Sequence, residues 1–95
     1  MASNKEYLDY VLDLLREVSG VTYKRMMGEY VLYKNDVIFG GIYDNRFLVK
    51  NVDSIKSYDL KEEIPFLGAK PLLLIESENA DEIKEIVNTV YNALK

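Results

Sequence analysis

The sequence predicts one α+β domain of two layers, in which helices pack against a mainly antiparallel sheet in the order α-β-β-β-β-α-β-α. Apolar residues near both ends of the chain recur with a helical period. Residues 22–50 instead alternate in character and are rich in β-branched and aromatic types, which is typical of strands. A chain of 95 residues can enclose one hydrophobic core but not two, so we expect a single domain spanning residues 1–95.

The first predicted helix covers residues 3–19. Ser3 and Glu6 have the spacing of a capping box, and Gly20 is expected to end the helix. Its predicted apolar stripe consists of Tyr7, Leu8, Val11, Leu12, Leu14, Leu15 and Val18.

Strands are predicted at residues 22–27, 29–34, 37–43 and 46–50. The last three are separated by Asn35-Asp36 and by Asp44-Asn45. Asparagine and aspartate tolerate a left-handed backbone, so both connections are expected to be the turns of antiparallel hairpins.

Methionines and glycines within this region have two alternative interpretations. Met26 and Met27 could offer a flexible contact surface for a partner, but strand alternation favours one methionine that enters the core and one that faces away from it. Gly28 is expected to separate two strands, although it could also open the backbone beside a ligand. Gly40 and Gly41 do not fit a phosphate-binding fingerprint, which opens a helix, and instead indicate a bulge or a close approach of another backbone.

A short second helix is expected to start near Asn51 or Asp53 and to end near residue 60. Residues 61–63 should then be exposed. The segment 64–71 contains both prolines and a glycine, so it is predicted to be an ordered loop.

The end of the chain combines a strand with a helix. The apolar run at residues 72–75 predicts a strand that is buried on both faces. Asn79 and Glu82 again fit a capping box, at the start of a helix whose apolar face comprises Ile83, Ile86, Val87, Val90, Tyr91 and Leu94.

Composition excludes several classes of chemistry. The chain has no cysteine and no histidine, which rules out disulfides, cysteine-ligated metals and histidine-based catalytic triads. Neither a signal peptide nor an apolar run of membrane-spanning length is recognisable, so a cytoplasmic protein without membrane contact is expected. We expect no cofactor, no metal site and no catalytic residue.

Nucleic-acid binding is less favoured, because the net charge is −4 and no ribonucleoprotein-type aromatic motif is present. Five aromatic and five basic residues form the one constellation that would suit stacked bases: Tyr23, Tyr30, Tyr33, Phe39, Tyr43, Lys24, Arg25, Lys34, Arg46 and Lys50. An acidic group comprises Glu76, Glu78, Asp81, Glu82 and Glu85. It indicates a solvated helix start and, second, an acidic edge for a partner.

Three motifs occur in a fixed order along nearly the whole chain: V-T-Y-K-R-M-M-G-E-Y-x-L-Y, F-G-G-I-Y-D-x-R-x-L-V-K and G-A-K-P. Together they resemble the amino-terminal domain of the TfoX/Sxy family, whose members are associated with regulation of bacterial competence for DNA uptake. The resemblance implies an α+β domain. It also implies a role beside other transcription proteins, since better-known members act as co-activators with the cyclic-AMP receptor protein. The helical carboxy-terminal domain of full-length members is absent from this sequence.

The resemblance assigns no catalytic residue, but several polar positions of its signature are not explained by core packing. We expect some of the charges of Arg25, Glu29, Lys50 and Lys70 to meet near Gly28 and the 68–71 loop, forming a small surface that binds an anion or a partner. The signature as a whole falls on Tyr23, Arg25, Met26, Met27, Gly28, Glu29, Tyr30, Phe39, Gly40, Gly41, Asp44, Arg46, Lys50, Gly68, Lys70 and Pro71.

The function that the sequence favours is a non-enzymatic regulatory or protein-interaction domain. Its expected partner is a protein, with the transcription machinery as one option, and the small size of the domain would also suit a homodimer. The alternative is a small-ligand or nucleotide-binding domain, and an enzyme using carboxylate, lysine or tyrosine chemistry comes third.

Overall fold

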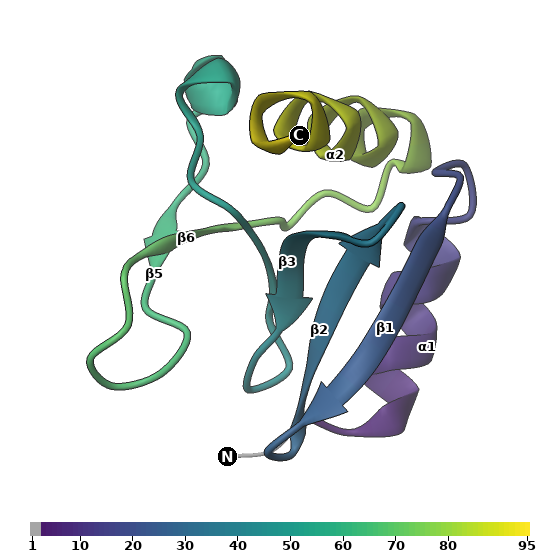
Figure 1. The fold of residues 1–95 in the computed structure, drawn as a ribbon, viewed down its shortest axis with the longest axis vertical. Helices are drawn as coiled ribbons and strands as arrows, with labels where there is room; N and C mark the ends of the chain where they lie inside the picture. Colours follow the sequence, from purple (N-terminus) through teal and green to yellow (C-terminus); the bar gives the residue numbers. More distant parts are fainter. Residues whose placement is uncertain (1–2) are drawn as a thin grey trace.

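The computed structural model of the protein describes residues 3–95 and confirms the α+β class (Figure 1). Its sheet has six strands in the order β1-β2-β3-β4-β6-β5, and each of these pairings is antiparallel. The strands are β1 (Val21–Met26), β2 (Glu29–Lys34), β3 (Val37–Ile42), β4 (Phe47–Val49), β5 (Glu62–Glu63) and β6 (Leu72–Leu74). The helices are α1 (Lys5–Leu14), the 3₁₀-helix η1 (Asp53–Tyr58) and α2 (Ala80–Leu94).

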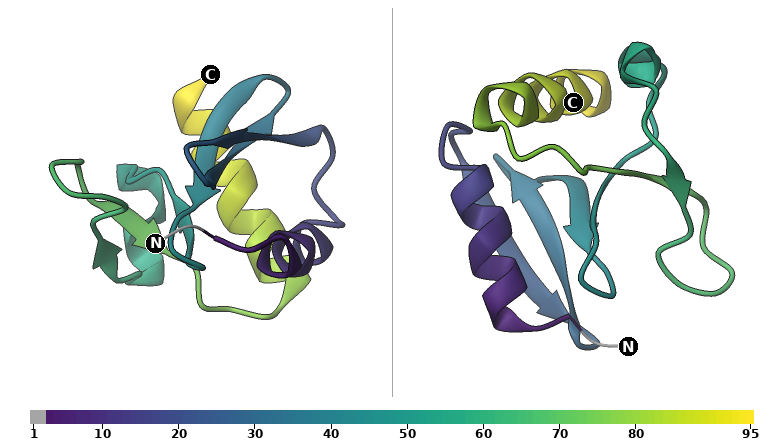
Figure 2. Two further views of the ribbon diagram at one scale, coloured as in Figure 1. Left: turned by 90° about the horizontal axis from the view of Figure 1, so that it is seen from below. Right: turned by 180° about the vertical axis from the view of Figure 1, so that it is seen from behind.

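Both α-helices pack on the same face of the sheet, as the view from behind shows (Figure 2). Tyr30, Ile42 and Phe47 lie side by side on β2, β3 and β4, and all three belong to the core beneath the helices. Because side chains alternate along a strand, the neighbouring row, Val31 and Leu48, points to the opposite side. Neither α-helix covers that side, which we call the open face, although Val31 and Leu48 themselves are buried there by other side chains.

The first helix is shorter than the sequence predicts. It runs from Lys5 to Leu14, and tighter turns continue the chain to Gly20, whose φ is 76°. The predicted capping box is wrong, because Asn4 is the N-cap: its side chain accepts a hydrogen bond from the Tyr7 amide. Ser3 is instead bonded to Glu29 on β2.

Each of the first three hairpins turns through two residues with positive φ. The predicted turns at Asn35-Asp36 and Asp44-Asn45 have φ values between 47° and 68°, which confirms the expected left-handed conformation. The turn between β1 and β2 consists of Met27 and Gly28, with φ values of 53° and 83°. Gly28 therefore separates the two strands, as predicted.

The methionine prediction is wrong, because neither Met26 nor Met27 enters the core. Met26 is 54% exposed at the end of β1, and Met27 is 97% exposed at the tip of the turn. The sequence assigned Met27 to a strand, where alternation would apply, whereas the hairpin places it in the turn itself.

Replacing Met27 with asparagine should stabilise the protein. Methionine is strained at a φ of 53° and gains no burial there, whereas Asn-Gly is the sequence that this type of two-residue turn prefers. We expect the Met27→Asn variant to gain about 1 kcal/mol in free energy of unfolding, measured by urea titration. An unchanged or reduced stability would show that the side chain makes a stabilising contact at the tip.

The two glycines of β3 are architectural, as the sequence indicated. A Cβ atom on Gly40 would collide with the Leu48 carbonyl oxygen and lie 2.9 Å from the Val49 Cα. One on Gly41 would lie 2.6 Å from the Tyr43 ring. The register between β2 and β3 also shifts beside Tyr33, so both a bulge and a close approach are present.

The segment after β4 differs from its prediction in three respects. The expected second helix is a 3₁₀-helix, η1, whose N-cap is Val52 with no side-chain cap. Asn51 instead donates a hydrogen bond to Glu62, 3.2 Å away. The sequence missed β5, which pairs with β6 at the sheet edge and leaves Glu63 half-buried. No strand or helix interrupts residues 64–71, so the predicted loop is confirmed.

The strand and helix at the end of the chain largely match their predictions. In β6, Leu73 is buried beside Val49 beneath the helices, but Leu72 and Leu74 are only half-buried, because alternation turns them to the open face, which no α-helix covers. Asn79 caps α2 by accepting hydrogen bonds from the amides of Asp81 and Glu82, but only half of the predicted capping box forms, because the Asn79 amide donates to the Ser77 hydroxyl and not to Glu82. Four of the predicted apolar residues of α2 are buried, namely Ile83, Ile86, Val87 and Val90. Among residues 3–95, no helix has both the length and the apolar character needed to cross a membrane.

A hydrogen bond between Tyr58 of η1 and Glu85 of α2 gives the protein a specific alkaline response. This bond raises the pKa of Tyr58 from 10.0 to about 12. In the unfolded chain Tyr58 ionises near pH 10, whereas in the folded protein it keeps its proton up to about pH 12. The stability that the Tyr58–Glu85 hydrogen bond contributes is therefore fully present below pH 10 and is lost between pH 10 and 12.

We therefore expect wild-type protein to lose more stability than Tyr58→Phe protein over that pH interval. Urea unfolding at several pH values measures the difference, and the variant removes the contribution of the other tyrosines from the comparison. Parallel stability curves for the two proteins would contradict this assignment.

Candidate functional site

Glu29, the acidic member of the predicted site, ties three segments together. Its Oε1 accepts hydrogen bonds from the Ser3 amide and hydroxyl, at 2.8 and 2.6 Å, and its Oε2 accepts one from the Asp44 amide at 3.0 Å. The Ser3 amide also approaches the Gly28 carbonyl, and the Ser3 hydroxyl accepts a hydrogen bond from the Asn45 amide. The structure thus brings Gly28 and Glu29 together in a joint between the start of α1 and two hairpin turns.

The three predicted basic residues lie elsewhere. Arg25 is exposed on β1 next to Met26, and alternation places it on the helix side of the sheet. Lys50 is exposed just beyond β4, at the opposite end of that strand from the Glu29 joint. Lys70 is exposed in the 64–71 loop. The structure does not gather these charges around Glu29, and their role in binding stays a prediction.

The aromatic and basic constellation is divided between the core and the surface. Tyr30 and Phe39 are core residues beneath the helices. Lys34 is 7% exposed, and its ammonium donates a hydrogen bond of 2.7 Å to the Ser19 carbonyl and lies 5.3 Å from the centre of the Tyr91 ring. Lys34 thus joins the turn before β1 to α2, and because it is buried together with Tyr30 and Phe39, none of the three is available to stack on bases.

A group of polar contacts on the open face is centred on Arg46. The Arg46 guanidinium contacts the carboxylate of Glu63 at 2.9 Å and the carbonyls of Ile64 and Pro65 at 3.2 and 3.4 Å. Its Nε donates to the Tyr43 carbonyl at 3.1 Å. Arg46 therefore fastens the 64–71 loop to the turn between β3 and β4.

The ring of Tyr43 bridges the sheet and this loop. It lies over Gly41, where the missing side chain leaves room, and its centroid is 6.1 Å from that of Phe66. Burial raises the pKa of Tyr43, and the nearby charge of Glu29 raises it further. Tyr43 thus remains a neutral, mainly apolar surface between the Glu29 joint and the loop.

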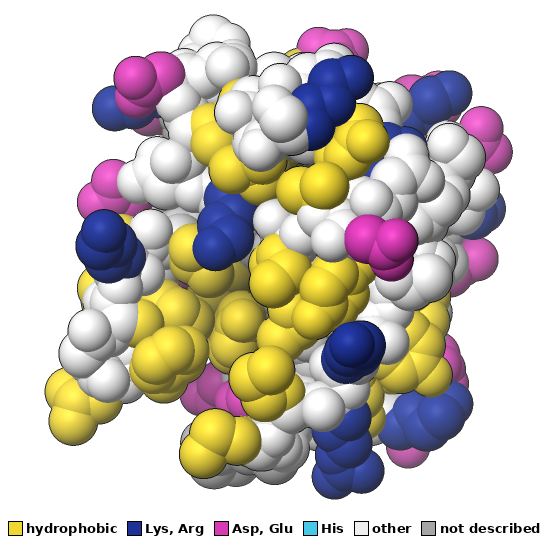
Figure 3. Space-filling model, in the orientation of Figure 1, with side chains coloured by type: hydrophobic (Ala, Val, Ile, Leu, Met, Phe, Trp, Pro, Cys, Tyr) yellow, Lys and Arg dark blue, Asp and Glu magenta, His cyan; other side chains and the backbone are white. Residues whose placement is uncertain are grey.

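Apolar side chains are exposed at both tips that border the open face. Phe66 and Leu67 in the loop are 61% and 101% exposed, which adds to the exposure of Met26 and Met27 on the first hairpin. In the orientation of Figure 1 both tips lie along the lower edge, and the space-filling view of the same face shows a broad hydrophobic area between and above them (Figure 3). Exposed apolar side chains that cluster on one side of a protein are typical of sites that contact a partner or ligand.

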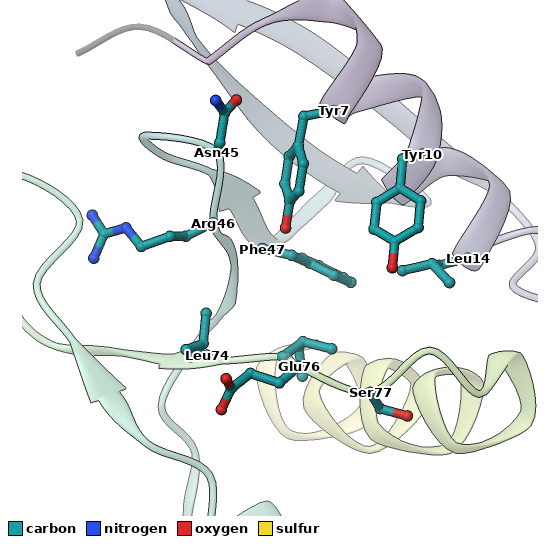
Figure 4. A pocket seen from close by; sticks show the side chains of 10 residues that line it. Tyr7, Tyr10, Leu14, Asn45, Arg46, Phe47, Leu74, Glu76 and Ser77 are labelled. Atoms are coloured by element: carbon teal, nitrogen blue, oxygen red, sulfur yellow. The ribbon is translucent and has the colours of Figure 1, made fainter.

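A separate cleft of about 390 Å³ lies on the helix side, between α1 and the segment that joins β6 to α2 (Figure 4). Tyr7 and Tyr10 of α1 form one wall together with Phe47, and the ring centroids of Tyr7 and Tyr10 are 5.7 Å apart. Glu76 and Ser77 lie on the opposite wall. Burial raises the pKa of Tyr7 above its usual value, with a smaller contribution from Tyr10.

Sequence reasoning missed both the apolar tips and the cleft. The positive φ of Met27 depends on the hairpin register, which the sequence left open by extending the first strand to residue 27. For the cleft one signal was present, because Tyr10 is a large aromatic residue outside the predicted apolar stripe of its helix and is 44% exposed.

Comparison with known proteins places the chain in a family but gives it no activity. No protein-family model matches the chain. It is 31% identical over 98 residues to the "Uncharacterized 12.7 kDa protein in trpE 5'region" of Spirochaeta aurantia, and the match covers 99% of this chain and 85% of that protein. Identity at this level over nearly the full length of both chains shows common ancestry, and the chain therefore belongs to the family of this uncharacterised 12.7 kDa protein.

Proposed function

We propose that the chain is a non-enzymatic, regulatory protein-interaction domain whose open face binds an apolar segment of a protein partner. The observation that carries the proposal is the exposure of Met26, Met27, Phe66 and Leu67 around a sheet face that neither α-helix covers. Flexible methionines and aromatic side chains are typical of interaction surfaces. The resemblance to the TfoX/Sxy family supports a regulatory setting, with the transcription machinery as a candidate source of the partner.

The charges beside this face favour acidic residues in the partner segment. Lys24 lies on the open face with its ammonium 5.7 Å from the centre of the Tyr33 ring. Lys50 follows Leu48 by two residues and so shares its side. The oxygens of Glu29 are already bonded to Ser3 and Asp44. Neither Lys24 nor Lys50 forms an ion pair among residues 3–95, so both can pair with acidic residues of a partner, and complementary charge steers and orients that partner.

Site-specific photo-crosslinking in cells of the native host tests the proposal. The photoreactive residue p-benzoylphenylalanine is placed at position 27, at position 67 and, as a matched exposed control on the helix side, at position 84 in α2. We expect positions 27 and 67 to give the same protein adduct, through a peptide that contains apolar and acidic residues, and position 84 to give none. Equal labelling from position 84, or adducts only with nucleic acid, would overturn the proposal.

A further inference from the structure

We propose that the cleft beside α1 binds an alkylammonium group, presented either by a small amine or by a lysine side chain. The cleft lies beside α1. Arg46 lines it and also contacts Glu63 on the open face, but the proposed protein-interaction function uses none of the lining residues directly. Its volume of about 390 Å³ lies within the range of small-molecule pockets.

The walls of the cleft suit the apolar substituents of such a cation. Tyr7, Tyr10 and Phe47 supply aromatic surface, and Leu14 and Ile75 supply aliphatic surface. In Figure 4 the hydroxyl ends of both tyrosines are directed toward the wall that carries Glu76 and Ser77. Aromatic faces attract cations electrostatically, and clusters of such rings are a known solution for binding methylated ammonium groups.

The charges that line the cleft determine the sign of the ligand. Arg46 is its only basic lining residue, and the guanidinium is directed away, bonded to Glu63 and to the backbone of the 64–65 segment. Glu76 is exposed and forms no ion pair among the residues that the structure describes. The cleft therefore has no unpaired basic group to bind an anion, whereas the unpaired carboxylate of Glu76 and the aromatic rings can bind a cation.

The test is a titration of the full chain, followed by the NMR signals of the Tyr7 and Tyr10 rings. The small-amine arm uses choline and tetramethylammonium. The side-chain arm uses the acetylated amides of lysine and trimethyllysine, and tert-butanol serves as the neutral analogue. We expect saturable shifts with at least one cationic arm, which identifies the source of the group, and none with tert-butanol at the same concentrations.

Variants distinguish the site from general attraction to an acidic protein. Glu76→Gln should weaken cation binding at least tenfold, whereas Glu78→Gln, which removes an exposed charge two residues away and outside the cleft, should leave it within twofold. Tyr10→Leu should weaken it as well, and that ring is partly exposed, so the fold is retained. The proposal is overturned if no cation saturates the site, if tert-butanol binds equally well, or if the two glutamate variants behave alike.

Discussion

Replacing Gly40 with alanine is expected to cost about 3 kcal/mol or more in free energy of unfolding. The added methyl group would meet the carbonyl of Leu48 and the Cα of Val49, which are backbone atoms of a buried neighbouring strand and cannot rotate away. Relief requires β3 and β4 to separate, and these strands carry much of the core. A domain with a typical stability of about 5–15 kcal/mol would lose a large share of it.

Gly68→Ala is the matched control, because the same methyl group would meet nothing within 4 Å there. Its cost is the backbone strain of a φ of 86°, about 1 kcal/mol. Urea unfolding followed by circular dichroism measures both variants. Equal losses at the two positions would mean that β3 and β4 are not as close as the structure places them.

The second large effect is expected at Glu29. In the Glu29→Gln variant the amide group must turn its own donor toward either the buried Ser3 amide or the exposed Asp44 amide, so one of these two donors loses its acceptor, and the neutral amide oxygen accepts the remaining bonds less strongly than the carboxylate does. We expect a loss of about 2–3 kcal/mol, because hydrogen bonds to a charged acceptor are stronger than neutral ones. Hydrogen exchange should accelerate at the amides of Ser3, Asp44 and Asn45 before the rest of the sheet opens.

Two further variants isolate that effect. Glu78→Gln removes the same charge at an exposed position and should change the stability by no more than about 0.5 kcal/mol. A double-mutant cycle between Glu29→Gln and Ser3→Ala should show coupling, because Ser3 donates two of the bonds. Additive losses would mean that Glu29 and Ser3 do not interact as the structure places them.

The parts of the fold that the sequence predicted are those set by local chemistry. Asn35-Asp36 and Asp44-Asn45 have the residue types that their turns require, and Asn79 has the side chain that caps α2. The parts it could not predict depend on distant partners. Ser3 looked like a helix cap because its competing acceptor, Glu29, is 26 residues away, and β5 exists only because β6 is beside it.

The candidate site shows the same division. Glu29 was singled out as a polar residue in need of an explanation, and the structure supplies one in the joint that it makes with Ser3 and Asp44. The positions of Lys50 and Lys70 could not be predicted, because a lysine at a strand end or in a loop gives no indication of the face of the domain on which it will lie. Met27 and Leu67 are exposed because one lies in a turn and the other in a loop. Turns and loops have no periodic hydrophobic pattern from which the exposure of a side chain could be predicted.

The strained, exposed tip at Met27 is expected to serve binding and not stability. The most direct measurement is the dissociation constant of the crosslinked partner segment for wild-type and Met27→Asn protein, determined by calorimetry alongside their unfolding free energies. We predict that the variant is more stable and binds at least tenfold more weakly, because removal of the apolar tip relieves strain and also removes a contact. Undiminished affinity in the stabilised variant would contradict the claim.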